Sequence, residues 1–487
     1  MNQRLRDKLK ELQQQSEQLE PSEKERKKLT QKVVQYSERF YDELPDKKVY
    51  EEPKSSKESL TFSFDEEPAS MDDLLSVFKE NVEIGGLTSA SGGHLGYIPG
   101  GGLYPSALGD FLAAVTNEYA GVSFAGPGAV KMERECVNWL CDLIGYSDTA
   151  GGNLTSGGSI ANLIALANAR DNADITSRDY HKTVIYTTHQ VHHCIIKAIK
   201  FAGLTDARLR LIDMDEKFRM KTGSLISQIK ADRQQGLIPL IIFASAGTTD
   251  VGAVDPLEEM AKIAEKHNIW FHVDAAYGGA FLLTDYGKEM MKGIKKADSV
   301  TVDPHKGLFL PYGTGALLVK DVKKLRTSQH MHANYLQDTY REAEISPADL
   351  SPELSKHFRA LRMWLPLKLF GIAPLRAALN EKLLLTRYAY NELKKIDYIQ
   401  TGPTPQLSIM HFRYVPQEGD ANAFNKELTE KIHQDGRIFL SSTHIDETVY
   451  LRLAVLSFRT HLETIDRAIA VLKEKINELT TRTVPVS

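Results

Sequence analysis

The chain has 487 residues, more than one simple hydrophobic core accommodates, so a large domain with smaller ones is expected. Hydrophobic residues make up 42% and charged residues 25%, and the net charge of −4 argues against a nucleic-acid or acidic-membrane partner. Three cysteines cannot build a disulfide scaffold, no stretch is apolar enough to cross a bilayer, and the first residues lack the apolar core of a secretory signal. We therefore expect a cytoplasmic protein.

The first 70 residues predict an N-terminal helical segment and a linker. Residues 1–50 are rich in Lys, Glu, Gln and Arg and carry apolar side chains at roughly helical spacing. This apolar face has no core of its own and needs a partner surface. The polar stretch 51–70 contains two prolines and is typical of a linker.

Residues 71–357 predict a large domain. Short β-branched runs alternate with helix-like segments such as 159–172 and 256–267, which indicates βαβ units and a mostly parallel sheet. The predicted strands are 183–188, 208–213, 237–245, 269–275 and 299–303.

Residues 358–487 predict a smaller C-terminal α+β domain. Helix-rich stretches surround two strand-like runs, 407–415 and 450–458. A final amphipathic helix is expected over 463–479.

Four polar motifs fall where strands end and helices begin, which is where parallel sheets bind ligands. The first comprises Thr155, Ser156, Gly157, Gly158 and Ser159. Glycines let a ligand approach the backbone, and hydroxyls with free N–H groups at a helix N-terminus suit a phosphate. A capped helix after an ordinary turn is the alternative interpretation.

The second motif is the histidine cluster from His189 to Cys194. Clustered imidazoles beside a thiol are plausible zinc ligands, but no second ligand cluster of matching spacing appears in the sequence. A solvated helix start is the ordinary alternative. A flat ring stacked on an aromatic cofactor is the third interpretation.

The third motif places Asp274 at the end of the apolar run 269–273, before the small residue Ala276. A carboxylate there is costly unless a cation or several donors meet it. A helix N-cap is one explanation. A partner for a protonated ring nitrogen is the other, with Ala276 leaving room for the ring.

The fourth motif places Lys306 directly after a β-like run and the Pro304 turn. A single lysine usually lies on the surface. Here it follows a Ser/Gly loop, a histidine cluster and Asp274 in that chain order, which favours a lysine held at the mouth of the sheet.

In these motifs the sequence resembles the group II pyridoxal-5′-phosphate (PLP) decarboxylases, which include the aromatic-L-amino-acid and glutamate enzymes. The Asp-Pro-His-Lys of 303–306 is similar to the family's Asn-Pro-His-Lys, and HVDAAYGG (272–279) matches the segment whose Asp pairs with the pyridine nitrogen. Further likeness lies in GYIPGGGLYPSALGDFL (96–112) and LRLAVLSFRT (451–460), so that it spans roughly residues 30–475.

The resemblance implies an α/β fold of the aspartate-aminotransferase type (fold type I), with a mostly parallel seven-stranded sheet and a small C-terminal domain. It implies a homodimer with shared active sites, in which residues 1–70 wrap the partner. The cofactor would be joined covalently to the lysine, and its ring would stack on His192. The cofactor-binding set that the resemblance implies is Lys306, Asp274, Ala276, His192, Ser156, Gly157, Gly158, Ser159, Thr248 and His305.

The implied reaction is decarboxylation of an L-amino acid to its amine and CO₂. Tyr335 lies in Asn-Tyr-Leu-Gln, which is similar to the family's Thr-Tyr-Leu-Lys, and would return a proton to Cα. In related aldehyde synthases the position that corresponds to Tyr335 resembles Phe instead, so Tyr335 favours plain decarboxylation. The catalytic set is therefore Lys306, His192, Tyr335 and Asp274.

The substrate is expected to be aromatic, because Tyr97-Ile98-Pro99 is similar to the aromatic branch. Plausible lining residues are Tyr97, Ile98, His94 and Phe124. The family pattern is broken at the Gly triplet 100–102, at 120–124, and at Asp303, which puts a negative charge near a phosphate unless it faces away. An aldehyde synthase, an acidic amino-acid decarboxylase and an aminotransferase using Arg452 and Arg459 remain alternatives.

Overall fold

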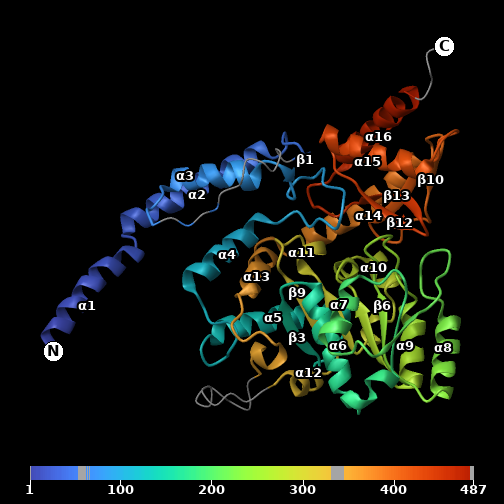
Figure 1. Ribbon diagram of the computed structural model, residues 1–487, viewed down its shortest axis with the longest axis horizontal. Coiled ribbons are helices and arrows are strands. Elements are labelled where there is room, and N and C mark those ends of the chain that lie inside the picture. Colours follow the sequence, from blue (N-terminus) through green and yellow to red (C-terminus); the bar gives the residue numbers. More distant parts are fainter. Residues whose placement is uncertain (1, 53–61, 63, 65, 331–344, 483–487) are drawn as a thin grey trace.

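The computed structural model describes residues 2–52, 62, 64, 66–330 and 345–482. Its N-terminal part is an arm of helices that extends away from the rest of the molecule (Figure 1). The arm consists of α1 (Asn2–Ser16), α2 (Glu23–Glu43) and α3 (Met71–Phe78), with α3 lying along α2. Helix α2 begins at a capping box, in which Ser22 Oγ accepts the Glu25 N–H and the Glu25 carboxylate accepts the Ser22 N–H.

The centre of the molecule is a seven-stranded sheet with the order β3-β9-β8-β7-β6-β4-β5. Strand β9 runs antiparallel to both of its neighbours, while β5, β4, β6, β7 and β8 are parallel. The strands are β3 (Gly151–Thr155), β4 (Thr183–Thr187), β5 (Arg208–Leu211), β6 (Ile238–Ser245), β7 (Trp270–Asp274), β8 (Ser299–Val302) and β9 (Gly315–Val319). The expected mostly parallel sheet is confirmed.

Helices cover both faces of this sheet because successive strand residues point to opposite faces. Along β6, Ile242 and Ala244 join the core that contains α5, α8 and α9, whereas Ile241 and Phe243 pack towards α6 and α7. The covering helices are α4 (Tyr104–Thr116), α5 (Pro127–Ile144), α6 (Gly158–Asp171), α7 (Cys194–Phe201), α8 (Thr222–Gln234), α9 (Leu257–His267), α12 (Val322–Gln329) and α13 (Arg359–Phe370). No helix among the described residues is long and apolar enough to cross a membrane.

The C-terminal part carries a second, four-stranded antiparallel sheet with the order β10-β11-β13-β12. Its strands are β10 (Ile399–Thr401), β11 (Ile409–Tyr414), β12 (Ser441–Ile445) and β13 (Thr448–Ala454). Helices α14 (Ala373–Leu393), α15 (Ala421–Asp435) and α16 (Leu462–Arg482) pack with this sheet around a separate apolar core. The expected small α+β unit is confirmed.

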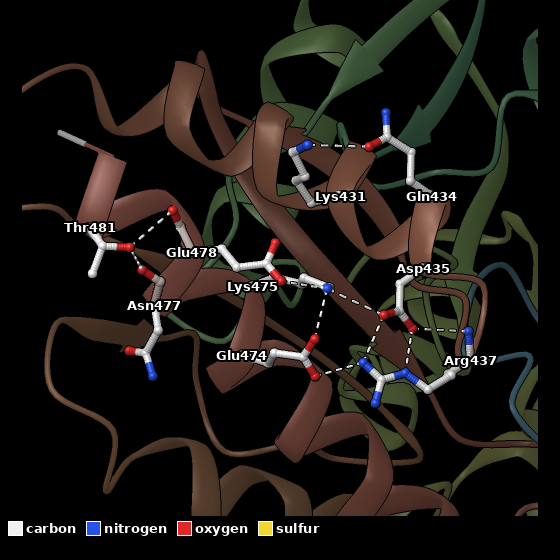
Figure 2. Close-up of polar contacts among 9 residues, drawn as sticks. All are labelled: Lys431, Gln434, Asp435, Arg437, Glu474, Lys475, Asn477, Glu478 and Thr481. Carbon is white, nitrogen blue, oxygen red and sulfur yellow. Dashed lines mark hydrogen bonds and ion pairs between the residues drawn. The ribbon is translucent and has the colours of Figure 1, made fainter.

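Charged side chains join α15 to α16 across this small unit (Figure 2). Asp435 pairs with Arg437 at 2.6 Å and with Lys475 at 3.3 Å, and Arg437 also reaches Glu474 at 2.6 Å. Asp435 and Lys475 are both about nine-tenths buried at the side chain, so this network connects the two helices where solvent screens it least.

Candidate active site

A cavity of about 260 Å³ opens at the edge of the large sheet where the parallel strands end. Segments that follow β3, β4, β6, β7 and β8 all contribute to its walls, as the topology of parallel sheets requires. All ten residues of the predicted cofactor-binding set line this cavity: Ser156, Gly157, Gly158, Ser159, His192, Thr248, Asp274, Ala276, His305 and Lys306.

Lys306 projects from a single helical turn, α11 (Pro304–Gly307), that directly follows β8. Its Nζ lies 3.1 Å from Asp303 Oδ2, and the Asp303 side chain is only 2% exposed. Burial alone would lower the pKa of Lys306, but Asp303 and Asp274 outweigh burial and the net shift is upward. The amine is therefore held as a cation between two carboxylates.

The surroundings of Asp303 show where its negative charge lies, at the position where the family pattern has Asn. Its carboxylate does not face open space, because Oδ2 meets Lys306 and Oδ1 is buried without a hydrogen-bond partner among the described residues. The side chain lies against the glycine loop that begins α6. A methyl group on Gly158 would lie 2.9 Å from Asp303 Oδ2 and 3.2 Å from the Ala276 Cβ.

The loop from Ser156 to Ser159 leads into the N-terminus of α6, whose first N–H groups have no partner within the helix. Its approach to β9 is close, since a methyl group on Gly315 would lie 2.6 Å from the Gly157 Cα. His305 lies beside the loop, and its Nδ1 is 2.6 Å from the Thr314 carbonyl oxygen, so Nδ1 carries the hydrogen. Glycine is required at position 315 because a side chain there would collide with the backbone of Gly157.

Asp274 ends β7 and points towards α6. Its Oδ2 accepts from Asn162 Nδ2 at 2.9 Å, and its Oδ1 accepts from the Ala276 N–H at 3.0 Å. Both carboxylate oxygens are therefore held in place where Asp274 lines the cavity, together with Lys306.

His192 and Thr248 complete the walls. His192 Nδ1 accepts the Cys194 N–H at 3.3 Å, and burial lowers the pKa of His192 although Asp274 opposes this shift. The imidazole is therefore neutral at pH 7. Thr248 Oγ1 accepts the Ala253 N–H at 3.0 Å, which fixes the turn after β6.

The four expected substrate residues lie outside the cavity lining. His94 and Ile98 are buried, whereas Tyr97 and Phe124 are more than half exposed. Tyr97 and His94 form an aromatic group with Phe439, which sequence reasoning did not identify. The Gly triplet 100–102 that follows these residues passes close to the backbone beside the cofactor lysine, since a methyl group on Gly100 would lie 2.2 Å from the His305 carbonyl oxygen.

Arg452 and Arg459 are engaged with backbone carbonyl groups. Arg452 donates to Asp250 and Thr249, and Arg459 donates to Ala90 and Gly101. Both guanidinium groups therefore hold the small unit and the Gly triplet in place. Tyr335 lies outside the described residues.

Sequence reasoning missed the residues behind Asp274. Asn162 bonds Asp274, and His272 Nε2 lies 2.9 Å from Asn162 Oδ1. The signal was available: His272 precedes Asp274 by two residues and so shares its face of β7, and Asn162 lies one turn along α6 from Gly158.

The chain matches a family model described as the pyridoxal-dependent decarboxylase conserved domain over residues 53–415. It belongs to this family. The aromatic-L-amino-acid decarboxylase of Bacillus atrophaeus is 34% identical over 473 residues, which cover 95% of this chain and 98% of that protein. Tryptophan decarboxylase 2 of Oryza sativa subsp. japonica is 27% identical, covering 88% and 89%.

A crystal structure of Oryza sativa TDC with PLP and tryptamine has the same fold, with a TM-score of 0.89 and 23% identity over 94% of this chain and 99% of that one. The chain is accordingly a PLP-dependent amino-acid decarboxylase, a carboxy-lyase of fold type I.

The residues of the cavity fit this cofactor. The amine of Lys306 suits the cofactor's aldehyde, and the glycine loop at the N-terminus of α6 suits its phosphate. The hydrogen-bonded carboxylate of Asp274 suits a protonated ring nitrogen. Ala276 presents only a methyl group to the same space, where a flat ring needs room.

Proposed function

We propose that this enzyme decarboxylates an aromatic L-amino acid to the corresponding amine and CO₂. One observation carries the choice of substrate: among the described residues that line the cavity, Lys306 is the only lysine or arginine. An acidic side chain would need a second cation. The aromatic rings of the expected substrate wall, those of Tyr97 and Phe124, are uncharged and more than half exposed, and the Bacillus atrophaeus relative supports the same choice.

The cofactor roles that we propose are supported by the presence of all these residues in the lining of one cavity. Lys306 carries PLP covalently, and Asp274 pairs with the ring nitrogen. His192, Ala276 and Thr248, which line the same cavity, would hold the ring. The phosphate binds the loop of Ser156, Gly157, Gly158 and Ser159, with His305 beside it.

Bound PLP supplies a conjugated ring that accepts the electron pair left when CO₂ departs from Cα. The protein residues decide how well it does so. Asp274 accepts from two N–H groups, so its carboxylate is held in one orientation towards the group it faces. His192 is neutral and offers a flat surface without adding charge.

The substrate wall consists of Tyr97, Ile98, His94 and Phe124. Gly100 packs against the backbone of His305 and Lys306, so this wall lies close to the cofactor lysine. The aromatic group of the substrate contacts Tyr97. His94 is neutral at pH 7, since burial lowers its pKa to about 4, and so adds no charge to the wall.

Tyr335 donates the proton that replaces CO₂ on Cα. This role distinguishes a decarboxylase from an aldehyde synthase, in which oxygen reacts before a proton is delivered. An aminotransferase is disfavoured because Arg452 and Arg459 are already bonded to backbone carbonyl groups.

The enzyme acts as a homodimer with shared active sites. Apolar side chains stay exposed along the arm and along α4, among them Phe78, Val82, Phe111 and Val115. Exposed apolar groups of this kind are typical of a surface that another protein covers. A second copy covers it and brings Phe124 to the neighbouring cavity. The three cysteines are buried thiols, which suits a cytoplasmic location.

The test is CO₂ release from the purified, PLP-loaded protein against the twenty common amino acids and L-DOPA, with products identified by mass. Equal amounts of amine and CO₂ from an aromatic substrate are expected. Release from glutamate or aspartate alone would overturn the substrate class. Aldehyde with peroxide, or an oxo-acid without CO₂, would overturn the reaction.

A further inference from the structure

A chain of polar side chains runs through the core behind Asp274. Trp270 Nε1 donates to Ser299 Oγ at 2.8 Å, and the same oxygen lies 2.8 Å from His272 Nδ1. His272 Nε2 lies 2.9 Å from Asn162 Oδ1, and Asn162 Nδ2 donates to Asp274. We propose that this hydrogen-bond chain has one fixed direction, that it ends by donating to Asp274, and that its members are positioning residues: Trp270, Ser299, His272 and Asn162.

The pattern of β7 explains why these groups meet. Trp270, His272 and Asp274 alternate along the strand and so share the face that looks towards α6. Between them, Phe271 and Val273 join the core on the other face. The polar groups are therefore confined to one seam between β7, β8 and α6.

The end of the chain at Asp274 has a fixed polarity. A carboxylate only accepts hydrogen bonds, so the Asn162 group that faces it is the NH₂. The Asn162 oxygen then faces His272, and it also accepts from Thr301 Oγ1 at 2.7 Å. Since an amide oxygen cannot donate, the hydrogen in that contact belongs to His272 Nε2.

The other end has the same polarity. The Trp270 indole only donates, so the Ser299 oxygen accepts from it. With hydrogen already on Nε2, a neutral His272 has an unprotonated Nδ1, which accepts the Ser299 hydroxyl hydrogen. Each bond thus donates in the direction of Asp274, and reversing any one would set two acceptors against each other.

His272 has to be neutral for this direction to hold. Its side chain is fully buried, and burial lowers the pKa of His272 to about 4, with Asp274 opposing. The groups that face it are uncharged: Ser299 on β8, Asn162 on α6, and the Phe243 ring on β6, 5.2 Å away between centroids. Asp274 is the charged group that acts on it.

The consequence for the site is that Asp274 cannot rotate without breaking the hydrogen-bond chain. Asn162 holds one carboxylate oxygen and the Ala276 N–H holds the other. The inference rests on the proposed function, because it assigns these residues to the group that Asp274 meets on the cofactor ring. Of the four residues, Asn162 lines the cavity, whereas Trp270, Ser299 and His272 lie behind its lining.

The first experiment reads the direction of the chain itself. In the full chain labelled with ¹⁵N-histidine, His272 is identified by its loss in His272→Gln and followed from pH 5 to 9, with and without PLP. A neutral ring with hydrogen on Nε2 throughout is expected. Hydrogen on Nδ1, or protonation within this range, would overturn the proposed direction.

The second experiment reads the effect at the cofactor. Dissociation constants are measured for PLP and for an analogue whose ring nitrogen is replaced by C–H, in the wild type, Asn162→Ala and Asn162→Asp. The wild type should prefer PLP, and both variants should lose about tenfold to a hundredfold of that preference, since a bond to a charged group is lost. Asn168→Ala, a buried asparagine of the same helix, is the control and should keep the preference.

The outcomes separate the two proposals. If the variants bind both ligands more weakly by the same factor, Asn162 supports only the fold and the inference is wrong. If the wild type itself does not distinguish the two ligands, the role of Asp274 in the proposed function is wrong. A variant that fails to fold would show no thermal transition, and the ¹⁵N measurement on the wild type then decides.

Discussion

Replacement of Asp303 by Asn changes the charge beside the cofactor lysine and almost nothing else in shape. Asp303 Oδ2 lies 3.1 Å from Lys306 Nζ and is buried. At an effective dielectric constant of about 20, unit charges at that separation attract by about 5 kcal/mol. Part of this attraction offsets the cost of removing both charged groups from water. In the variant, Asp274 remains to stabilise the ammonium of Lys306.

The variant should therefore capture PLP faster at neutral pH. Only the unprotonated amine adds to an aldehyde, and removing Asp303 lowers the pKa of Lys306 because the strongest opposite charge is lost. Each unit of that shift is a tenfold gain in reactive amine, so capture at pH 7 should rise at least about tenfold. The gain should shrink as pH rises towards the range where the wild-type amine is also unprotonated.

The assay is stopped-flow absorbance of protein freed of cofactor and mixed with PLP, from pH 6 to 9. Asp298→Asn is the matched control, because this buried carboxylate stands at the opposite end of β8 and bonds the Phe271 N–H. Its capture rate should equal that of the wild type. Equal or slower capture by Asp303→Asn across the pH range would refute the assigned pairing.

Three further outcomes are expected. Gly158→Ala should weaken PLP binding about tenfold or more, measured by fluorescence titration, because its methyl group would lie 2.9 Å from Asp303 Oδ2; unchanged binding would contradict the packed loop. Tyr335→Phe should convert part of the amine product to aldehyde with peroxide, and an unchanged product ratio would remove its role as proton donor. Asp435→Asn should destabilise the protein by about 1–2 kcal/mol in urea unfolding at pH 7, because Arg437 holds the pKa of Asp435 at about 2 and the partners are partly exposed (Figure 2). A carboxyl group with a depressed pKa stabilises the fold above its unfolded pKa near 4, so the deficit should disappear as pH falls towards 2, and a deficit that persists there would contradict the pairing.

The parallel strands and the two central residues of the site were accessible from sequence because their signals are local. Strands β4, β6, β7 and β8 are mostly apolar runs between helical segments; Asp274 ends one of them, and Lys306 follows another after a short turn. By contrast, β3 reads Gly-Gly-Asn-Leu-Thr and has no alternating pattern. Its place at the sheet edge depends on pairing with β9, far along the chain.

Contacts over long sequence separations were out of reach for the same reason. His272 and Asn162 are 110 residues apart, and no spacing rule links them until the sheet is assembled. The ion pair of Asp303 with Lys306 had a local signal, a three-residue separation at a helix start, but sequence alone could not show which way Asp303 faces. The need for a small residue at Gly100 likewise becomes clear only in the folded chain, where this residue packs against the His305 carbonyl group.

The location of the covalently bound cofactor tests the central claim most directly. The PLP-loaded protein is reduced with borohydride, digested, and mapped by mass spectrometry. A single reduced pyridoxyl group on Lys306 is the predicted result. A group on another lysine, or none on a protein that still releases CO₂ from amino acids, would contradict the assignment of this cavity as the active site.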